Sequence, residues 1–99
     1  IKLAKDVSVI RALRSLGNSL VAQCADDEAK KELKKLSDML NYCDPVSNDA
    51  TVAAETELKA LMEEIQRAMV DNDDTSVVPL CKKAEAILAE RNRLCKLNK

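Results

Sequence analysis

Apolar residues recur at alternating steps of three and four along almost the whole chain, which is the spacing of one face of an α-helix. The first such stripe predicts a helix over residues 3–24. Gly17 lies within this stripe, where glycine costs about 1 kcal/mol relative to alanine. We therefore expect either a close approach of another helix or a local kink at Gly17. The stripe contains Leu3, Val7, Ile10, Leu13, Gly17, Leu20 and Cys24.

The stripe loses its phase after Cys24, because the next positions on the same face are charged. Asp26, Asp27 and Glu28 lie at this slip, and an aspartate there can cap a new helix, which favours a second helix over residues 26–42. No glycine or proline marks a turn here. One long helix that bends at residues 24–28 therefore remains an alternative.

Proline, aspartate, serine and asparagine cluster at residues 43–49, and these residue types favour a loop. A third helix is predicted over residues 50–71, with Ser47 or Asn48 as its cap. A fourth is predicted over residues 75–96, with Pro79 in its first turn, where a missing N–H costs little. Their inner faces are predicted to carry Val52, Leu58, Leu61, Met62, Ile65, Ala68 and Met69, and Val78, Cys81, Ala84, Leu88, Leu94 and Cys95.

Segments of similar length joined by short connections predict an all-α fold, an up-down antiparallel helical bundle. It would have four helices, or three with a long bent first helix. Ninety-nine residues suffice for one domain with a modest core. We expect residues 1–99 to form a single helical-bundle domain, and a start at Ile1 rather than Met is compatible with a fragment of a longer chain.

Composition excludes several kinds of chemistry. The chain has no histidine, tryptophan or phenylalanine, and Tyr42 is its one aromatic residue. Without histidine it cannot build a phosphotransfer histidine, a Glu-x-x-His di-iron site, or a Ser-His or Cys-His nucleophile. We therefore expect no enzymatic activity, no catalytic residues and no cofactor.

Charge argues against nucleic acid as a partner. The net charge is −1, and the basic tract at residues 30–35 lacks the arginine and aromatic side chains of a base-reading surface. No apolar run reaches the roughly 18 residues of a membrane span, although a removed membrane segment would be compatible with the basic C-terminus. Residues 49–75 are acidic and residues 76–99 basic. This segregation predicts adjacent third and fourth helices joined by ion pairs at the rim.

The four cysteines, Cys24, Cys43, Cys81 and Cys95, lack the C-x-x-C spacing of zinc ribbons and thioredoxins. Their low density favours buried free thiols in a cytoplasmic protein, and no metal site is expected. A secreted, disulfide-stabilised protein is the alternative. In an antiparallel bundle Cys43 and Cys95 share one end and Cys24 lies at a height similar to that of Cys81, so the pairs Cys24–Cys81 and Cys43–Cys95 are conceivable.

These observations favour a non-enzymatic helical-bundle domain that mediates protein–protein interaction or self-association, for example as a dimer. Several apolar residues beside the main stripes widen the predicted apolar faces, and a partner would cover them. A small-ligand-binding bundle with space near Gly17, Ala54 and Ala84 is a further alternative. The predicted interface residues are Val9, Leu16, Val21, Val70, Val77 and Leu80.

Overall fold

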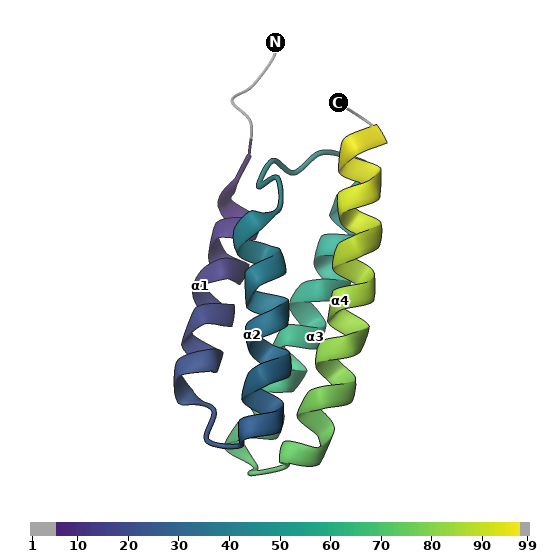
Figure 1. The fold of residues 1–99 in the computed structure, drawn as a ribbon. Coiled ribbons are helices and arrows are strands. Elements are labelled where there is room, and N and C mark those ends of the chain that lie inside the picture. Colours follow the sequence, from purple (N-terminus) through teal and green to yellow (C-terminus); the bar gives the residue numbers. More distant parts are fainter. Residues whose placement is uncertain (1–5, 98–99) are drawn as a thin grey trace.

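The computed structural model describes residues 6–97, which form four packed helices and no strand (Figure 1). They are α1 (Ser8–Gln23), α2 (Asp27–Tyr42), α3 (Val52–Val70) and α4 (Asp74–Leu97). The predicted all-α bundle is therefore confirmed. The first helix begins later than predicted, and Leu3 lies outside the described residues.

A turn separates α1 from α2. Cys24 ends α1 in an extended conformation, with φ −75° and ψ 127°. The side chain of Asp26 accepts a hydrogen bond from the Ala29 backbone N–H at 2.9 Å, which satisfies one of the free donors at the start of α2. The four-helix alternative is correct, and the long bent helix is wrong.

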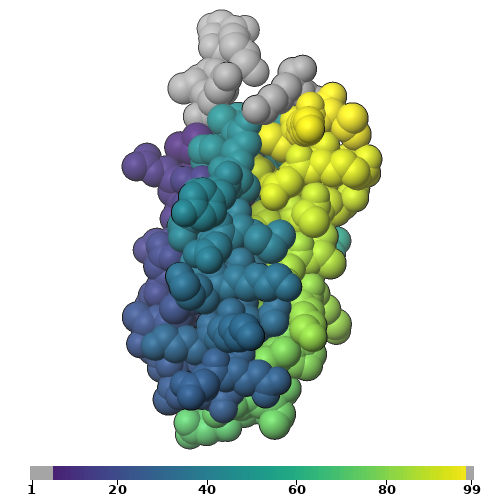
Figure 2. Space-filling model, in the orientation of Figure 1, coloured from purple at the N-terminus to yellow at the C-terminus, as the bar shows by residue number. Residues whose placement is uncertain are grey.

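The helices alternate in direction, but their order around the bundle differs from their order in the chain. Close approaches join α1 to α2, α2 to α4, α4 to α3, and α3 to α1. Figure 2 shows one of these faces, on which α2 fills the space between α1 and α4. Helices α2 and α3 therefore lie diagonally opposite, and two of the neighbouring pairs, α1 with α3 and α2 with α4, run parallel.

This arrangement requires the connection between α2 and α3 to cross one end of the bundle (Figure 1). We call residues 43–51 the crossover segment. The two other connections, at residues 24–26 and 71–73, are short turns between neighbouring helices at the opposite end. The fold therefore depends on how the crossover segment is held.

Gly17 marks a close approach of three helices. A Cβ at this position would lie 3.4 Å from Leu40 Cδ1 of α2 and 3.5 Å from Met62 Cε of α3. These distances confirm the close approach predicted at Gly17. Helix α1 continues unbroken from Ser8 to Gln23, so no break of the helix accompanies it.

Details of α3 and α4 differ from the sequence prediction. Val52, expected on the inner face of α3, is exposed, whereas Val77, expected on an outer surface, is buried in the core. Helix α4 begins at Asp74, so Pro79 is its sixth residue and lies beyond the first turn. Asn72, with φ 59°, turns the chain between the two helices in the left-handed region that asparagine tolerates.

Candidate functional site

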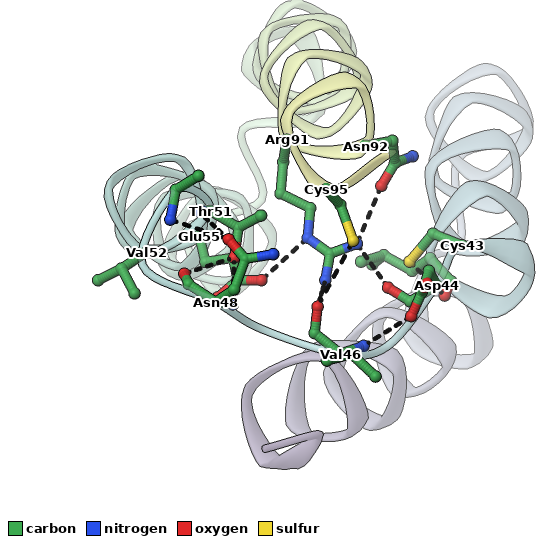
Figure 3. A network of polar contacts seen from close by, with 12 residues as sticks. Cys43, Asp44, Val46, Asn48, Thr51, Val52, Glu55, Arg91, Asn92 and Cys95 are labelled. Carbon is green, nitrogen blue, oxygen red and sulfur yellow. Dashed lines mark hydrogen bonds and ion pairs between the residues drawn. The ribbon is translucent and has the colours of Figure 1, made fainter. Parts of the chain in front are cut away.

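Arg91 forms the centre of a buried polar network at the crossover end of the bundle (Figure 3). Its side chain is 0% exposed and projects from α4. Nε donates to Glu55 Oε2 of α3 at 2.9 Å, and Nη2 donates to the carbonyl oxygen of Val46 at 2.9 Å. Nη1 donates to the carbonyl oxygen of Asp44 and to Asn92 Oδ1. One guanidinium therefore joins α4, α3 and the crossover segment.

Arg14 of α1 holds the beginning of the same segment. Its Nε donates to the carbonyl oxygen of Leu40 at 2.7 Å, and its Nη2 donates to that of Cys43 at 2.8 Å. Carbonyls in the last turn of a helix lack intrahelical partners, and a cationic donor satisfies them well. Arg14 and Arg91 together fix where α2 ends and where the chain crosses toward α3.

Asn48 and Thr51 close a turn of the crossover segment directly before α3. Asn48 Oδ1 accepts hydrogen bonds from the Ala50 N–H at 2.8 Å and from the Thr51 N–H at 3.2 Å. The Thr51 hydroxyl oxygen accepts in turn from the Asn48 N–H at 2.9 Å. The N-cap of α3 is Thr51, whose side chain makes no capping hydrogen bond, so the predicted cap at Ser47 or Asn48 is wrong. The backbone N–H of Ser47 instead donates to the carbonyl oxygen of Asp6.

Sequence reasoning missed both partners of the buried ion pair. It expected rim ion pairs between the acidic and basic segments, whereas Glu55 and Arg91 are 3% and 0% exposed. The signal was available, because Arg91 lies one turn after the core residue Leu88 and Glu55 one turn before Leu58. A charged residue on the core stripe of each adjacent helix indicates a buried pair.

A second charged cluster joins α2 to α4. Lys35 Nζ lies 3.5 Å from Glu85 Oε1 and 3.9 Å from Glu32 Oε2. The Oε2 atoms of both glutamates are buried, and no hydrogen-bond donor reaches them. Burial, followed by the neighbouring Glu32, raises the pKa of Glu85 to about 7, against the opposing effect of Lys35.

All four cysteines are free thiols in this structure. Cys43 and Cys95 lie at the crossover end, where their sulfur atoms approach the carbonyl oxygens of Leu40 and Val46 at 3.3 and 3.6 Å. Cys24 and Cys81 are buried toward the other end, and both predicted disulfide pairings stay predictions. Within residues 6–97 no three histidine, cysteine or acidic side chains are grouped to hold a metal ion.

An apolar groove runs along the surface between α3 and α4. Its volume is about 450 Å³, and we call it the α3–α4 groove. Alanines line it at exposed positions, with half-buried Leu61 and Ile87 beside them. Charged side chains stand at its edges, acidic on α3 and basic on α4. The groove is lined by Glu57, Ala60, Leu61, Lys83, Ala86 and Ile87.

The predicted interface residues are scattered over the bundle. Val9 and Leu16 line a second groove of about 310 Å³ between α1 and α3. Val21 and Leu80 are half-buried, whereas Val70 is 74% exposed. Val77 is buried, so its expected place on an interacting surface is wrong. The apolar residues of the α3–α4 groove were not among the predicted interface residues.

Space for a small ligand was expected near Gly17, Ala54 and Ala84. Neither of these two grooves is lined by any of the three residues, nor is a shallow pocket between the α1–α2 turn and the start of α4. Ala84 is fully buried in the core, and Leu40 and Met62 fill the space beside Gly17. The ligand-binding alternative therefore has no support in these grooves.

Comparison with known proteins adds no identification. No family model, no curated protein and no solved structure matches the chain. Among the described residues, no helix combines the length and the apolar character that crossing a membrane requires.

Proposed function

We propose that this protein is a non-enzymatic interaction module that self-associates through the α3–α4 groove. The observation that carries the proposal is the apolar lining of this groove at the surface. Exposed Ala60 and Ala86 leave room for another backbone to approach, and the half-buried Leu61 and Ile87 offer apolar side chains beside them. Covering such a surface removes apolar area from water, which favours association.

Charge favours a second copy of the chain as the occupant. A two-fold axis parallel to the groove places α3 of each copy over α4 of the other. The Glu55–Arg91 pair sets the register of these antiparallel helices. Counting back along α4 from Arg91 and forward along α3 from Glu55 by the same number of residues brings Lys83 level with residues 63–64.

Glu64 and Glu57 share one stripe of α3, because they are two helical turns apart. Glu57 lines the α3–α4 groove, whereas Glu63 lines the groove toward α1. Lys83 of each copy would therefore face Glu64 of the other. Glu90 lies two turns further along α4 and would face Glu57 of the other copy. Because Glu90 is already paired with Arg93, the repulsion between these two carboxylates is small.

The test is light scattering coupled to size-exclusion chromatography over a concentration series, with and without reductant. We expect a reductant-insensitive dimer. Lys83→Glu and Glu64→Lys should each weaken dimerisation by about tenfold or more. Each substitution places like charges opposite one another at both symmetry-related positions of the interface. Combining both substitutions in one chain should restore the dimer, since the charges are exchanged.

Lys30→Glu is the matched control, because Lys30 is exposed on α2 and lies outside the groove. It should leave the dimer unchanged. A monomer at every concentration would refute self-association and direct attention to a different protein partner. A dimer that ignores Lys83→Glu and Glu64→Lys would refute the α3–α4 groove as its interface.

A further inference from the structure

The outer face of α3 carries a regular line of exposed residues that runs from the first residue of the helix to the last. Its members recur at alternating steps of four and three, so they share one face of the helix. This face is separate from the one that lines the α3–α4 groove. We call it the α3 outer stripe, and it consists of Val52, Thr56, Lys59, Glu63, Gln66 and Val70.

The two ends of the stripe are apolar. The side chains of Val52 and Val70 are 52% and 74% exposed, and they are two of the four large apolar side chains exposed within residues 6–97. Val52 points away from the network around Arg91 (Figure 3). A single exposed valine needs no explanation. Two on one face, at equal distances from Leu61 in the middle of a helix of 19 residues, indicate a surface that something covers.

The stripe is self-complementary when it is reversed. Lys59 and Glu63 lie at equal distances on either side of the level of Leu61 and carry opposite charges. Within residues 6–97 neither of these two side chains belongs to an ion pair. An antiparallel copy of α3 centred on Leu61 therefore brings Lys59 opposite Glu63 and Val52 opposite Val70. A parallel copy would instead place each charge opposite its own like charge.

From this symmetry we propose that the α3 outer stripe is a second self-association surface, on which α3 packs antiparallel against α3 of another copy. The two-fold axis is perpendicular to the helix at the level of Leu61. Lys59 of each copy pairs with Glu63 of the other, so two ion pairs form at the centre. Each valine at the ends of the stripe covers a valine of the other copy, which removes apolar area from water.

Helix α1 contributes apolar surface beside the stripe. The groove of about 310 Å³ between α1 and α3 borders the stripe at Lys59 and Glu63. Val9 and Leu16 line this groove from α1 and are half-buried. A second copy laid along the stripe covers both of them, which adds to the apolar area that association removes from water.

This inference does not depend on the α3–α4 groove, because the two surfaces lie on different sides of α3. The stripe has charged residues at its centre, whereas the groove is apolar there, so we expect the stripe to bind more weakly. A chain that uses both surfaces forms a dimer first. At higher concentration the dimers join into larger assemblies, because the two symmetry axes differ in direction.

The test is sedimentation velocity over a concentration series in a Lys83→Glu background, in which the contact at the α3–α4 groove is weakened. We expect a dimer to persist at the higher concentrations. Adding Lys59→Glu or Glu63→Lys should each raise its dissociation constant by at least about tenfold, because like charges then lie opposite one another at both symmetry-related positions. Adding both together should restore the dimer, because the charges are exchanged.

Lys30→Glu is the matched control, because Lys30 is exposed on α2, diagonally opposite α3, and it should change nothing. Val70→Lys should weaken association without disturbing the helix, since a cation suits the end of α3. If Lys59→Glu and Glu63→Lys leave the assembly unchanged, or if combining them does not restore it, the proposal is wrong. If Lys59→Glu dissociates the natural chain and Lys83→Glu does not, the stripe is supported and the α3–α4 groove is refuted.

Discussion

Arg91 Nε lies 2.9 Å from Glu55 Oε2, and both side chains are buried between α3 and α4 at the end of the bundle where the chain crosses over. Taking two charges out of water costs several kcal/mol per ion unless further hydrogen bonds satisfy them. Arg91 meets this condition through the carbonyl oxygens of Asp44 and Val46. The buried ion pair therefore depends on the crossover segment, whose backbone supplies the additional acceptors for Arg91.

Removing Arg91 should be strongly destabilising. Arg91→Met leaves the Glu55 carboxylate buried without its partner and removes the guanidinium donor from the carbonyl oxygens of Asp44 and Val46. We expect the free energy of unfolding to fall by about 3–5 kcal/mol, measured by urea denaturation. If Arg91→Met fails to fold, urea denaturation of Glu55→Gln, followed by circular dichroism, is the milder test. The glutamine side chain has nearly the same shape as glutamate but carries no charge.

Two further variants separate the roles of Arg91. Adding Glu55→Leu to Arg91→Met removes the unpaired charge, so part of the stability should return, but the carbonyl oxygens of Asp44 and Val46 still lack the guanidinium donor. Arg93→Ala is the control, because Arg93 pairs with Glu90 in solvent, and it should cost far less stability than Arg91→Met. Full recovery in the double variant would contradict a role for Arg91 in holding the crossover segment.

The sequence predicted the helices because each buries a stripe at helical spacing. It also predicted an aspartate cap at the start of α2, whose signal is local, and the structure identifies this aspartate as Asp26. The neighbour order was not predictable in the same way. Short connections indicate that consecutive helices run in opposite directions, but residues 43–51 are long enough to cross a diagonal. Only tertiary contacts, those of Arg14 and Arg91, determine that they do.

The interface prediction was limited by a different cause. Apolar residues beside a stripe can turn either inward or outward, and small rotations of a helix decide which. Val77 is buried, whereas Val70 is exposed. The exposed alanines of the α3–α4 groove carry almost no signal in a single sequence, because alanine is common on every face of a helix.

Asp26→Ala should reduce stability by about 1 kcal/mol, because it removes the acceptor for the Ala29 N–H at the start of α2. Chemical denaturation of the purified variant measures this loss. Asp27→Ala is the matched comparison. Asp27 lies in the first turn and interacts with the helix dipole, so its loss should cost only a few tenths of a kcal/mol. Equal losses in the two variants would argue against the cap.

Gly17→Ala should raise the free energy of unfolding by roughly 0.5–1 kcal/mol. Alanine restricts the unfolded chain and favours the helix, and its Cβ would meet Leu40 and Met62 at ordinary contact distances. Gly17→Leu should instead destabilise the bundle, because no space remains for a larger side chain. Thermal melting of both variants checks the prediction, and destabilisation by alanine would show that the helices cannot accommodate even one added methyl group.

Stability should depend on pH through Glu85. Its pKa is raised from an ordinary 4.5 to about 7 in the folded protein. Between these values the folded state holds a proton that the unfolded state has lost. The free energy of unfolding therefore falls as pH rises from about 4.5 to 7, and this contribution is fully lost above 7.

Glutamine cannot ionise, so the variant Glu85→Gln should lack the fall in stability with pH. The difference in the free energy of unfolding between Glu85→Gln and the natural chain should therefore favour the variant more at pH 8 than at pH 5. Urea denaturation of both proteins across this range measures the difference. Lys35→Met should extend the fall to higher pH, because the nearby ammonium group opposes the rise of the Glu85 pKa. Glu63→Gln, at an exposed position outside the α3–α4 groove, serves as the control and should show the same fall with pH as the natural chain. Parallel pH curves for Glu85→Gln and the natural chain would show that Glu85 is already ionised at pH 5.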